Sequence, residues 1–156
     1  MKRVEYRDTI HGEDIEFLAY DLSEESKRGL VALGHDPLQS LIDGVRESAR
    51  VRVVLVDGFV AGIFGIVPRE WGGQLWFLTG TVVERLPKAF ARAIPDTFRY
   101  LCKGFPMVAN IAHCQNKFSL NMAKHFGFKI YNPTPYGPHG ELFHAVKWEA
   151  PNVHRG

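Results

Sequence analysis

The chain has 156 residues, of which 46% are hydrophobic and 23% are charged. These proportions are typical of a globular domain and exclude a disordered, collagenous or repeat protein. Lysine and arginine number 19 against 17 aspartates and glutamates, and a formal net charge of +2 does not favour nucleic acid as a partner. We expect a single domain over residues 1–156 that folds without a metal or a disulfide.

The sequence gives no sign of a membrane or export segment. No apolar run approaches the ~18 residues of a membrane span, and the N-terminus is polar and acidic where a signal peptide would be apolar. Cys102 and Cys114 are the two cysteines, which agrees with a fold that needs no disulfide. We therefore expect a cytoplasmic protein that binds no membrane.

The first third of the chain carries one weak strand pattern followed by helical patterns. Residues 3–10 alternate weakly and indicate a first strand. Residues 13–22 repeat apolar side chains with helical period behind an acidic first turn. Ser23 is typical of the N-cap of a further helix that Gly34 would end, and Asp36, followed by proline, is the clearest helix start in the sequence.

A β-hairpin and a central strand are expected next. Residues 51–56 form a β-branched run, Asp57-Gly58 is a hairpin turn signal, and residues 59–67 supply the returning strand. Residues 68–73 are expected as a loop. The strand over residues 74–79 has the aromatic and aliphatic side chains that suit the centre of a sheet.

The second half alternates helices and strands. Helical period extends over residues 87–103, where Pro95 predicts a kink or break near Ile94. The remaining expected elements are a strand over 107–112, a helix over 116–126 closed by Gly127, strands over 129–131 and 141–148, and a Pro- and Gly-rich loop over 132–140.

The predicted order β-α-α-β-β-β-α-β-α-β-β belongs to the α/β class, with an α+β mixed sheet. A strand-helix-strand arrangement in the second half requires a crossover and hence parallel pairing, whereas the hairpin at Asp57-Gly58 requires antiparallel pairing. Ligands usually bind such sheets near the carboxyl ends of the strands, where neighbouring strands diverge. We expect the functional site there.

The segment from Asn116 to Phe128 has a distinctive pattern. Asn is a good N-cap, Gly127 can supply a left-handed residue, and the following Phe can pack back onto the helix. An Asn that opens this helix and a Gly-Phe pair that closes it, together with the element order, resemble the GNAT superfamily of N-acetyltransferases over nearly the whole chain. With Trp76, Pro87 and Phe90, the segment also resembles the small GNAT-like proteins of podovirus-type tailed bacteriophages.

The resemblance implies acetyl-CoA as cosubstrate, bound between a central pair of splayed parallel strands. Its pantetheine would pair with the backbone of Phe77, Leu78 and Thr79, opposite residues 111–114. Further cofactor contacts would come from Gly80, Arg85, Lys88, Asn116 and Ser119. The family's phosphate-binding loop is rich in glycine, whereas the segment between Thr79 and Phe90 has one early glycine and a proline.

The resemblance also implies catalysis by positioning an amine beside the thioester and by moving its proton. Glu70 before the central strand, Glu84 after it and His125 near a helix end are the candidate catalytic residues. A family tyrosine seven residues after the Asn is replaced by Ala123. The acceptor would contact Tyr20, Tyr136 and His139. The carboxylates of Glu24 and Glu25 would suit an amine acceptor, but these residues serve equally well in the first turn of a helix.

The sequence also bears on two other classes of function, a metal site and a binding protein without catalysis. His113, Cys114, Cys102 and His139 lack the paired spacing of a structural zinc site, so no metal is expected. The competing hypothesis is a GNAT-shaped protein that binds a host or phage protein without acetyl transfer, which the altered loop and Ala123 favour. The main prediction is an acetyl-CoA-dependent N-acyltransferase that acts on a protein amine, in the host cytoplasm if the chain is phage-encoded, and that can dimerise.

Overall fold

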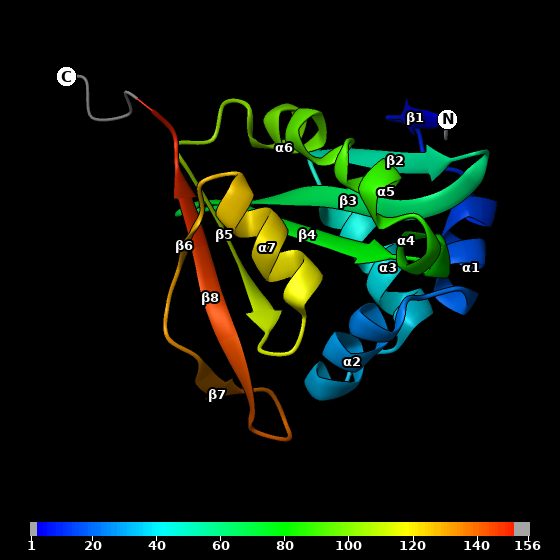
Figure 1. The fold of residues 1–156 in the computed structure, drawn as a ribbon. Coiled ribbons are helices and arrows are strands. Elements are labelled where there is room, and N and C mark those ends of the chain that lie inside the picture. The colour runs from blue at the N-terminus through cyan, green and yellow to red at the C-terminus, as the bar shows by residue number, and fades with distance from the viewer. Residues whose placement is uncertain (1–2, 152–156) are drawn as a thin grey trace.

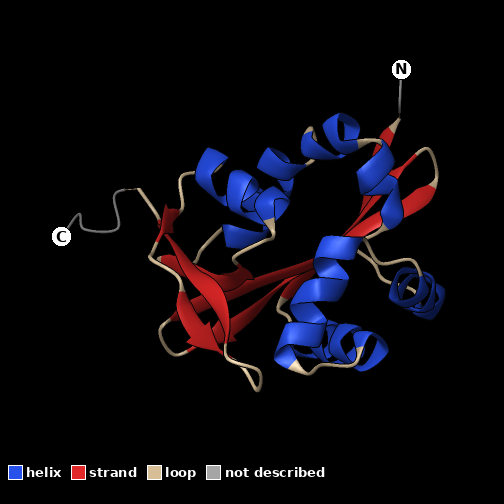
Figure 2. Cartoon of the chain, turned by 60° about the horizontal axis from the view of Figure 1, so that its bottom comes forward, coloured by secondary structure: helices blue, strands red, loops and turns tan. Residues whose placement is uncertain are grey.

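The computed structural model describes residues 3–151 as helices packed on both faces of one mixed sheet (Figures 1 and 2). Residues 1–2 and 152–156 of the expected domain lie outside the described part. The strands are β1 Val4–Arg7, β2 Arg50–Val56, β3 Phe59–Arg69, β4 Gly72–Thr79, β5 Met107–His113, β6 Lys129–Ile130, β7 Thr134–Tyr136 and β8 Glu141–Glu149. Within this part of the chain they lie in the order β1-β2-β3-β4-β5-β8-β6, with β7 paired to β8.

The sheet is mixed, as predicted, because β4 pairs with β5 in parallel while the hairpin strands β2 and β3 are antiparallel. The helices are α1 Gly12–Tyr20, α2 Glu24–Leu33, α3 Pro37–Glu47, α4 Thr81–Arg85, α5 Pro87–Ala91, α6 Ile94–Cys102 and α7 Lys117–His125. One apolar core lies between the sheet and α1 to α3, and a larger one between the sheet and α4 to α7. Among residues 3–151, no helix is long and apolar enough to cross a bilayer.

Local capping and turn signals in the sequence form as predicted. The side chains of Ser23, Asp36 and Asn116 each accept a backbone N–H three residues along, at the first turns of α2, α3 and α7. Asp57 and Gly58 have φ of 51° and 83°, the positive values that a tight hairpin turn requires. These short-range contacts fix where the helices and the hairpin begin.

Several elements differ from the sequence prediction. Three helices separate β1 from β2, as the three helix signals at residues 13–22, Ser23 and Asp36 predict, whereas the predicted element order counted only two. Residues 68–73 are not a loop, because β3 continues to Arg69 and a turn at residues 70–71 leads directly into β4. Pro68 is tolerated in β3 because the pairing of β3 with β2 has ended at Ile66, so no bond to β2 is lost. The expected break near Ile94 is confirmed by the separation of α5 from α6, whereas α4 and β7 are additional.

Candidate active site

The central parallel strands β4 and β5 are paired at one end only. Their register holds for Gly73 with Val108 and for Gln74 with Ala109, after which the strands part toward their carboxyl ends (Figure 1). Gly72 permits the close approach at the paired end, because a Cβ there would collide with the carbonyl oxygen of Met107. The splayed pair expected from the sequence is therefore present, and we call the space between the strands the V-shaped opening.

Backbone groups of both strands face this opening. The N–H of Gly80 donates toward β3, to the carbonyl of Ala61 (2.8 Å), while the N–H of Thr79 points away from β3 and donates to Ser26 Oγ (2.9 Å). Because the direction of these groups alternates along a strand, Phe77 presents its N–H and carbonyl to the opening, whereas Leu78 faces β3. Phe77 thus offers an edge to which an extended ligand can pair.

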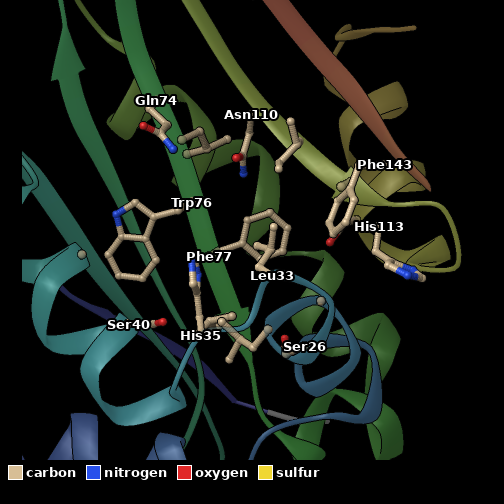
Figure 3. Close-up of a pocket in the computed structure, with 18 of the residues that line it drawn as sticks. Ser26, Leu33, His35, Ser40, Gln74, Trp76, Phe77, Asn110, His113 and Phe143 are labelled. Atoms are coloured by element: carbon tan, nitrogen blue, oxygen red, sulfur yellow. The ribbon is translucent and has the colours of Figure 1, made fainter. Parts of the chain in front are cut away.

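A cavity of about 740 Å³ occupies the V-shaped opening (Figure 3). Its floor is formed by β4 from Gln74 to Leu78 and by β5 from Asn110 to His113. Residues of α2 and α3 line it on one face of the sheet, and Phe98 of α6 and Ala123 of α7 line it on the other. We call this space the large cavity.

Trp76 forms a wall of the large cavity and leaves the opening free. Its indole Nε1 donates to Ser48 Oγ at the end of α3 (2.8 Å). The ring lies so close to Gly44 and Gly65 that a Cβ at either glycine would come within 2.9 Å of it. Two glycines on different elements therefore hold the indole against α3 instead of between the strands.

Two histidines line the large cavity, and they differ in whether their ring nitrogens are hydrogen-bonded. The Nδ1 of His113 accepts the N–H of Gln115 (3.1 Å), so its Nε2 carries the proton that it donates to Glu141 (2.6 Å). His35 follows α2 and points toward Phe77 (Figure 3), and within residues 3–151 its imidazole makes no hydrogen bond or ion pair. His35 is therefore the histidine whose ring nitrogens are available to a ligand.

The open end of β4 is covered by the connection between α1 and α2. Leu22 forms a β-bridge with Gly80, and the N–H of Ser23 donates to the carbonyl of Thr79 (2.9 Å). Glu25 of α2 accepts the N–H of Phe118 in α7 (3.3 Å). These contacts separate the large cavity from a smaller one of about 300 Å³, which Glu25 also lines.

Comparison with known proteins rests on structure, because no family model and no curated protein matches the sequence. An acetyltransferase of the GNAT family from Streptococcus pneumoniae is similar at a TM-score of 0.62 and 12% identity, over 95% of this chain and 100% of that one. Ard1 from Thermoplasma volcanium gives 0.69 and 17%, over 94% and 97%. The chain has the GNAT fold.

A third similar structure, a putative acetyltransferase from Salmonella typhimurium, was solved with its cofactor acetyl-CoA. Its TM-score is 0.64 at 16% identity, over 94% of this chain and 93% of that one. In this chain, the open end of β4 leads through Gly80 into α4.

Carboxylates and internal bonds occupy that region after β4. The N–H of Thr81 donates to the carbonyl of Asp21 and its hydroxyl donates to the Asp21 carboxylate, both at 2.8 Å. Glu84 accepts the N–H of Glu24 (2.8 Å). These bonds place two carboxylates, Asp21 and Glu84, beside the start of α4.

The residues predicted from the sequence divide into three groups. Those that line the large cavity are Phe77, Leu78, Asn116, Ser119 and Tyr136. Those that line the small cavity are Thr79 and Glu84. Those that line neither are Tyr20, Glu70, Gly80, Arg85, Lys88, His125 and His139. Glu70 lies in the β3–β4 turn, next to the paired end of β4 and β5.

Sequence reasoning missed many residues of the large cavity, of which four carry polar or aromatic side chains important to the site. These are Ser26, His35, Asn110 and Phe143. Asn110 is the residue directly after the last β4–β5 pair, so a correct register for β5 would have placed it in the opening. Ser26 and His35 carry no such signal, because their position depends on how α2 packs across the end of β4.

Outside the cavity, two charged or nucleophilic groups have a structural role. Arg7 donates two hydrogen bonds to the buried carboxylate of Asp14 (2.8 and 2.9 Å), which lowers the pKa of Asp14 and holds α1 against β1. Burial raises the pKa of the Cys102 thiol to about 12. At neutral pH that thiol is protonated and is a poor nucleophile.

Proposed function

We propose that this chain is an acetyl-CoA-dependent N-acyltransferase that acts on a protein amine. The observation that carries the proposal is the parting of β4 from β5, which leaves a cavity of about 740 Å³ beside the unpaired edge of Phe77. An extended amide-bearing arm can add to such an edge by main-chain hydrogen bonds. The pantetheine arm has this form, and its thioester would then reach the paired end of the opening.

The acceptor side of the large cavity favours a cationic amine. Its described lining carries the carboxylates of Glu25, Asp36, Asp43 and Glu47, next to the indole of Trp76, against the one guanidinium of Arg69, which pairs with Glu47 (3.9 Å). Carboxylates attract an ammonium group and an aromatic face adds a cation–π contact. We assign His35 as the group that takes the proton from the bound ammonium, because its ring is free of partners within the described residues.

The opening of the large cavity to the surface favours a protein amine as the acceptor. The large cavity reaches the surface beside Tyr136, which is 54% exposed, and β7. A flexible protein terminus or a lysine can enter there. Following the resemblance to phage proteins, we propose a host protein as the acceptor, with the host cytoplasm as the place of action.

A second function is favoured by the contacts at the open end of β4. The backbone of Thr79 is bonded to Ser23 and Ser26, and Asp21 and Glu84 face the place expected for the pyrophosphate. If the chain does not bind the cofactor, the Thr79 backbone can be bonded internally and carboxylates can lie at this place without loss of function. The second candidate is therefore a GNAT-shaped protein that binds a host or phage protein without acetyl transfer, with Trp71 and Tyr136 as exposed aromatic contacts.

Titration of the purified full chain with acetyl-CoA separates the two functions. Calorimetry should detect binding if the first is correct, and acetyl-CoA at 100 times its dissociation constant should stabilise the chain by about 2.7 kcal/mol. At roughly 2–4 °C per kcal/mol for this length, the melting temperature should rise by about 5–11 °C. Absence of heat and of any shift at millimolar acetyl-CoA would reject the first function and favour the second.

A transfer assay then tests catalysis itself. Host lysate proteins incubated with the chain and acetyl-CoA should gain acetyl groups that mass spectrometry detects. His35→Gln should bind acetyl-CoA as the parent does and lose at least tenfold in transfer rate, because general-base catalysis contributes about 10²–10⁴. His144→Gln is the matched control and should leave the rate unchanged, because His144 of β8 lines neither cavity and its ring bonds to the carbonyl of Tyr131 (2.8 Å).

A further inference from the structure

The deep end of the large cavity extends past the strands into the core under α6 and α7. Its walls there are buried apolar side chains, each no more than 7% exposed: Leu75, Phe98, Ala123, Phe128 and Val146. Asn110 of β5 adds a side-chain amide to the same part of the cavity. We call the space among these residues the apolar recess.

Ala123 leaves the recess open. Phe98 packs against Phe77 and Phe128, with ring centroids 6.2 and 6.0 Å apart, so the aromatic walls hold one another in place. Ala123, in the second turn of α7, lines the recess with no more than a methyl group. A larger side chain at this position would fill the recess, so the size of residue 123 sets how far a ligand can reach.

The recess lies where the reactive end of an acyl thioester would come to rest. An arm that enters from the open ends of β4 and β5 and pairs with Phe77 has its tip at the closed end, beside Gln74 and Asn110. The carbonyl can accept a hydrogen bond from the Asn110 amide at this point. Any carbon chain beyond the carbonyl would extend into the apolar recess.

We propose that the chain selects an acyl group longer than acetyl and that Ala123 determines this selection. The proposal rests on the acyltransferase function proposed above and names its donor class. The neutral amine nitrogen attacks the thioester carbonyl carbon, the new C–N bond forms and the C–S bond breaks. Sulfur leaves with the bonding pair and takes up the proton that the amine gives up, so the products are an amide and free CoA.

Binding of a series of acyl-CoAs to the purified full chain tests the proposal without relying on turnover. Calorimetric titrations with CoA, acetyl-CoA, propionyl-CoA, butyryl-CoA and hexanoyl-CoA should show affinity that rises by about fourfold for each methylene that enters the recess. Butyryl-CoA should therefore bind roughly fifteenfold more tightly than acetyl-CoA. Equal affinities for acetyl-CoA and butyryl-CoA would overturn the proposal.

Variants that fill the apolar recess with a larger side chain at position 123 provide the second part of the experiment. Ala123→Leu, and the smaller change Ala123→Val in case the first variant folds poorly, should abolish the preference for butyryl-CoA while affinity for acetyl-CoA remains. Lys124→Leu adds the same side chain one residue along, at an exposed position outside the cavity, and should keep the preference.

The outcomes separate the two proposals. Binding of acyl-CoAs without dependence on chain length, or a preference that survives in both Ala123 variants, overturns the selection by Ala123 and leaves the transferase function in place. No binding of CoA or of any acyl-CoA overturns the transferase function, and the selection falls with it.

Discussion

The two ends of β4 lie in the same strand and have opposite roles. At the Gly72 end, glycines bring the strand against Met107 and β5, and the parallel ladder forms. At the Thr79 end, β5 is gone and the backbone is held by Ser23 and Ser26 of a different element. Between them, Phe77 has neither partner. A free edge for a ligand thus arises at Phe77, between the part of β4 that pairs with β5 and the part that bonds to Ser23 and Ser26.

The V-shaped opening is therefore held in shape at both ends of β4, by the pairing with β5 at one end and by the contacts with α2 at the other. If the paired end were loosened, β4 and β5 could shift in register, and the edge at Phe77 would lose its position. If the α2 contacts at the other end were lost, the cavity would widen and Thr79 would join the free edge. Variants at each end should therefore affect stability and ligand affinity in different proportions.

The largest effect is expected at the paired end. Gly72→Ala places a Cβ against the Met107 carbonyl at a residue with φ of 147°, a conformation that side chains disfavour. We expect a loss of about 3 kcal/mol in the free energy of unfolding. Urea unfolding followed by circular dichroism measures it. Gly12→Ala is the control, because a Cβ at Gly12 would meet nothing within 4 Å, and an unchanged stability for Gly72→Ala would refute this role of the glycine.

A somewhat smaller loss of stability is expected at the ion pair that anchors α1 to β1. The end of α1 leads into the connection that covers Thr79. Asp14→Asn breaks the charged pair with Arg7 and should cost about 2 kcal/mol at pH 7. Because the hydrogen bonds from Arg7 lower the pKa of Asp14 in the folded state, this stability is present above the pKa of an unfolded aspartate. It is lost as the pH falls below about 4 and through the folded value.

The parent and Asp14→Asn should therefore converge in stability on acidification. Thermal melts at intervals from pH 7 to pH 2.5 would show the gap narrowing. A gap that stays constant over this range would mean that the Asp14 carboxylate is not the source of the stabilisation.

The contact between α2 and the open end should show a smaller cost in stability. Ser26→Ala leaves the buried N–H of Thr79 without its acceptor, at about 1–2 kcal/mol. If α2 and the pantetheine arm compete for Thr79, the same change should tighten acetyl-CoA binding. Ser40→Ala is the control, because Ser40 lines the same cavity and its hydroxyl makes no hydrogen bond within residues 3–151. Weaker acetyl-CoA binding by Ser26→Ala alone would argue against competition.

The smallest effect concerns charge at the junction of the two cavities. Glu25→Gln keeps an oxygen that can accept the N–H of Phe118 and removes the negative charge near the start of α7. The loss in stability should be about 0.5 kcal/mol, from the helix dipole. Affinity for the anionic cofactor should rise and should become less sensitive to salt. Titrations at two ionic strengths provide the measurement, and an affinity below that of the parent would contradict it.

The sequence predicted those parts of the fold that depend on neighbouring residues. Asp36 before a proline and Asp57-Gly58 between two apolar runs each specify a cap or turn through contacts within four residues. The mixed sheet followed from the chain order, because a crossover and a hairpin require different pairings. The resemblance carried by Asn116 and Gly127 then placed the opening between the correct strands.

The site was predicted less completely because its contacts are remote in sequence. Ser23 and Thr79 are 56 residues apart, and their contact depends on the packing of two helices and a strand. Trp76 fits against α3 only because glycines at 44 and 65 leave room for it, and neither glycine is marked as such in the sequence. Glu84 lines the small cavity and not the large one, and its bond to the N–H of Glu24, 60 residues away, could not be predicted from the segment after β4.

Amide hydrogen exchange at Phe77, followed residue by residue by NMR, tests most directly that the opening is a ligand edge. In the free protein the Phe77 amide should exchange rapidly, while those of Trp76 and Leu78, bonded to β3, are protected. Saturating acetyl-CoA should slow exchange at Phe77 and leave its neighbours as they were. A Phe77 amide that is already protected in the free protein, or one that saturating acetyl-CoA leaves unprotected, would contradict the account.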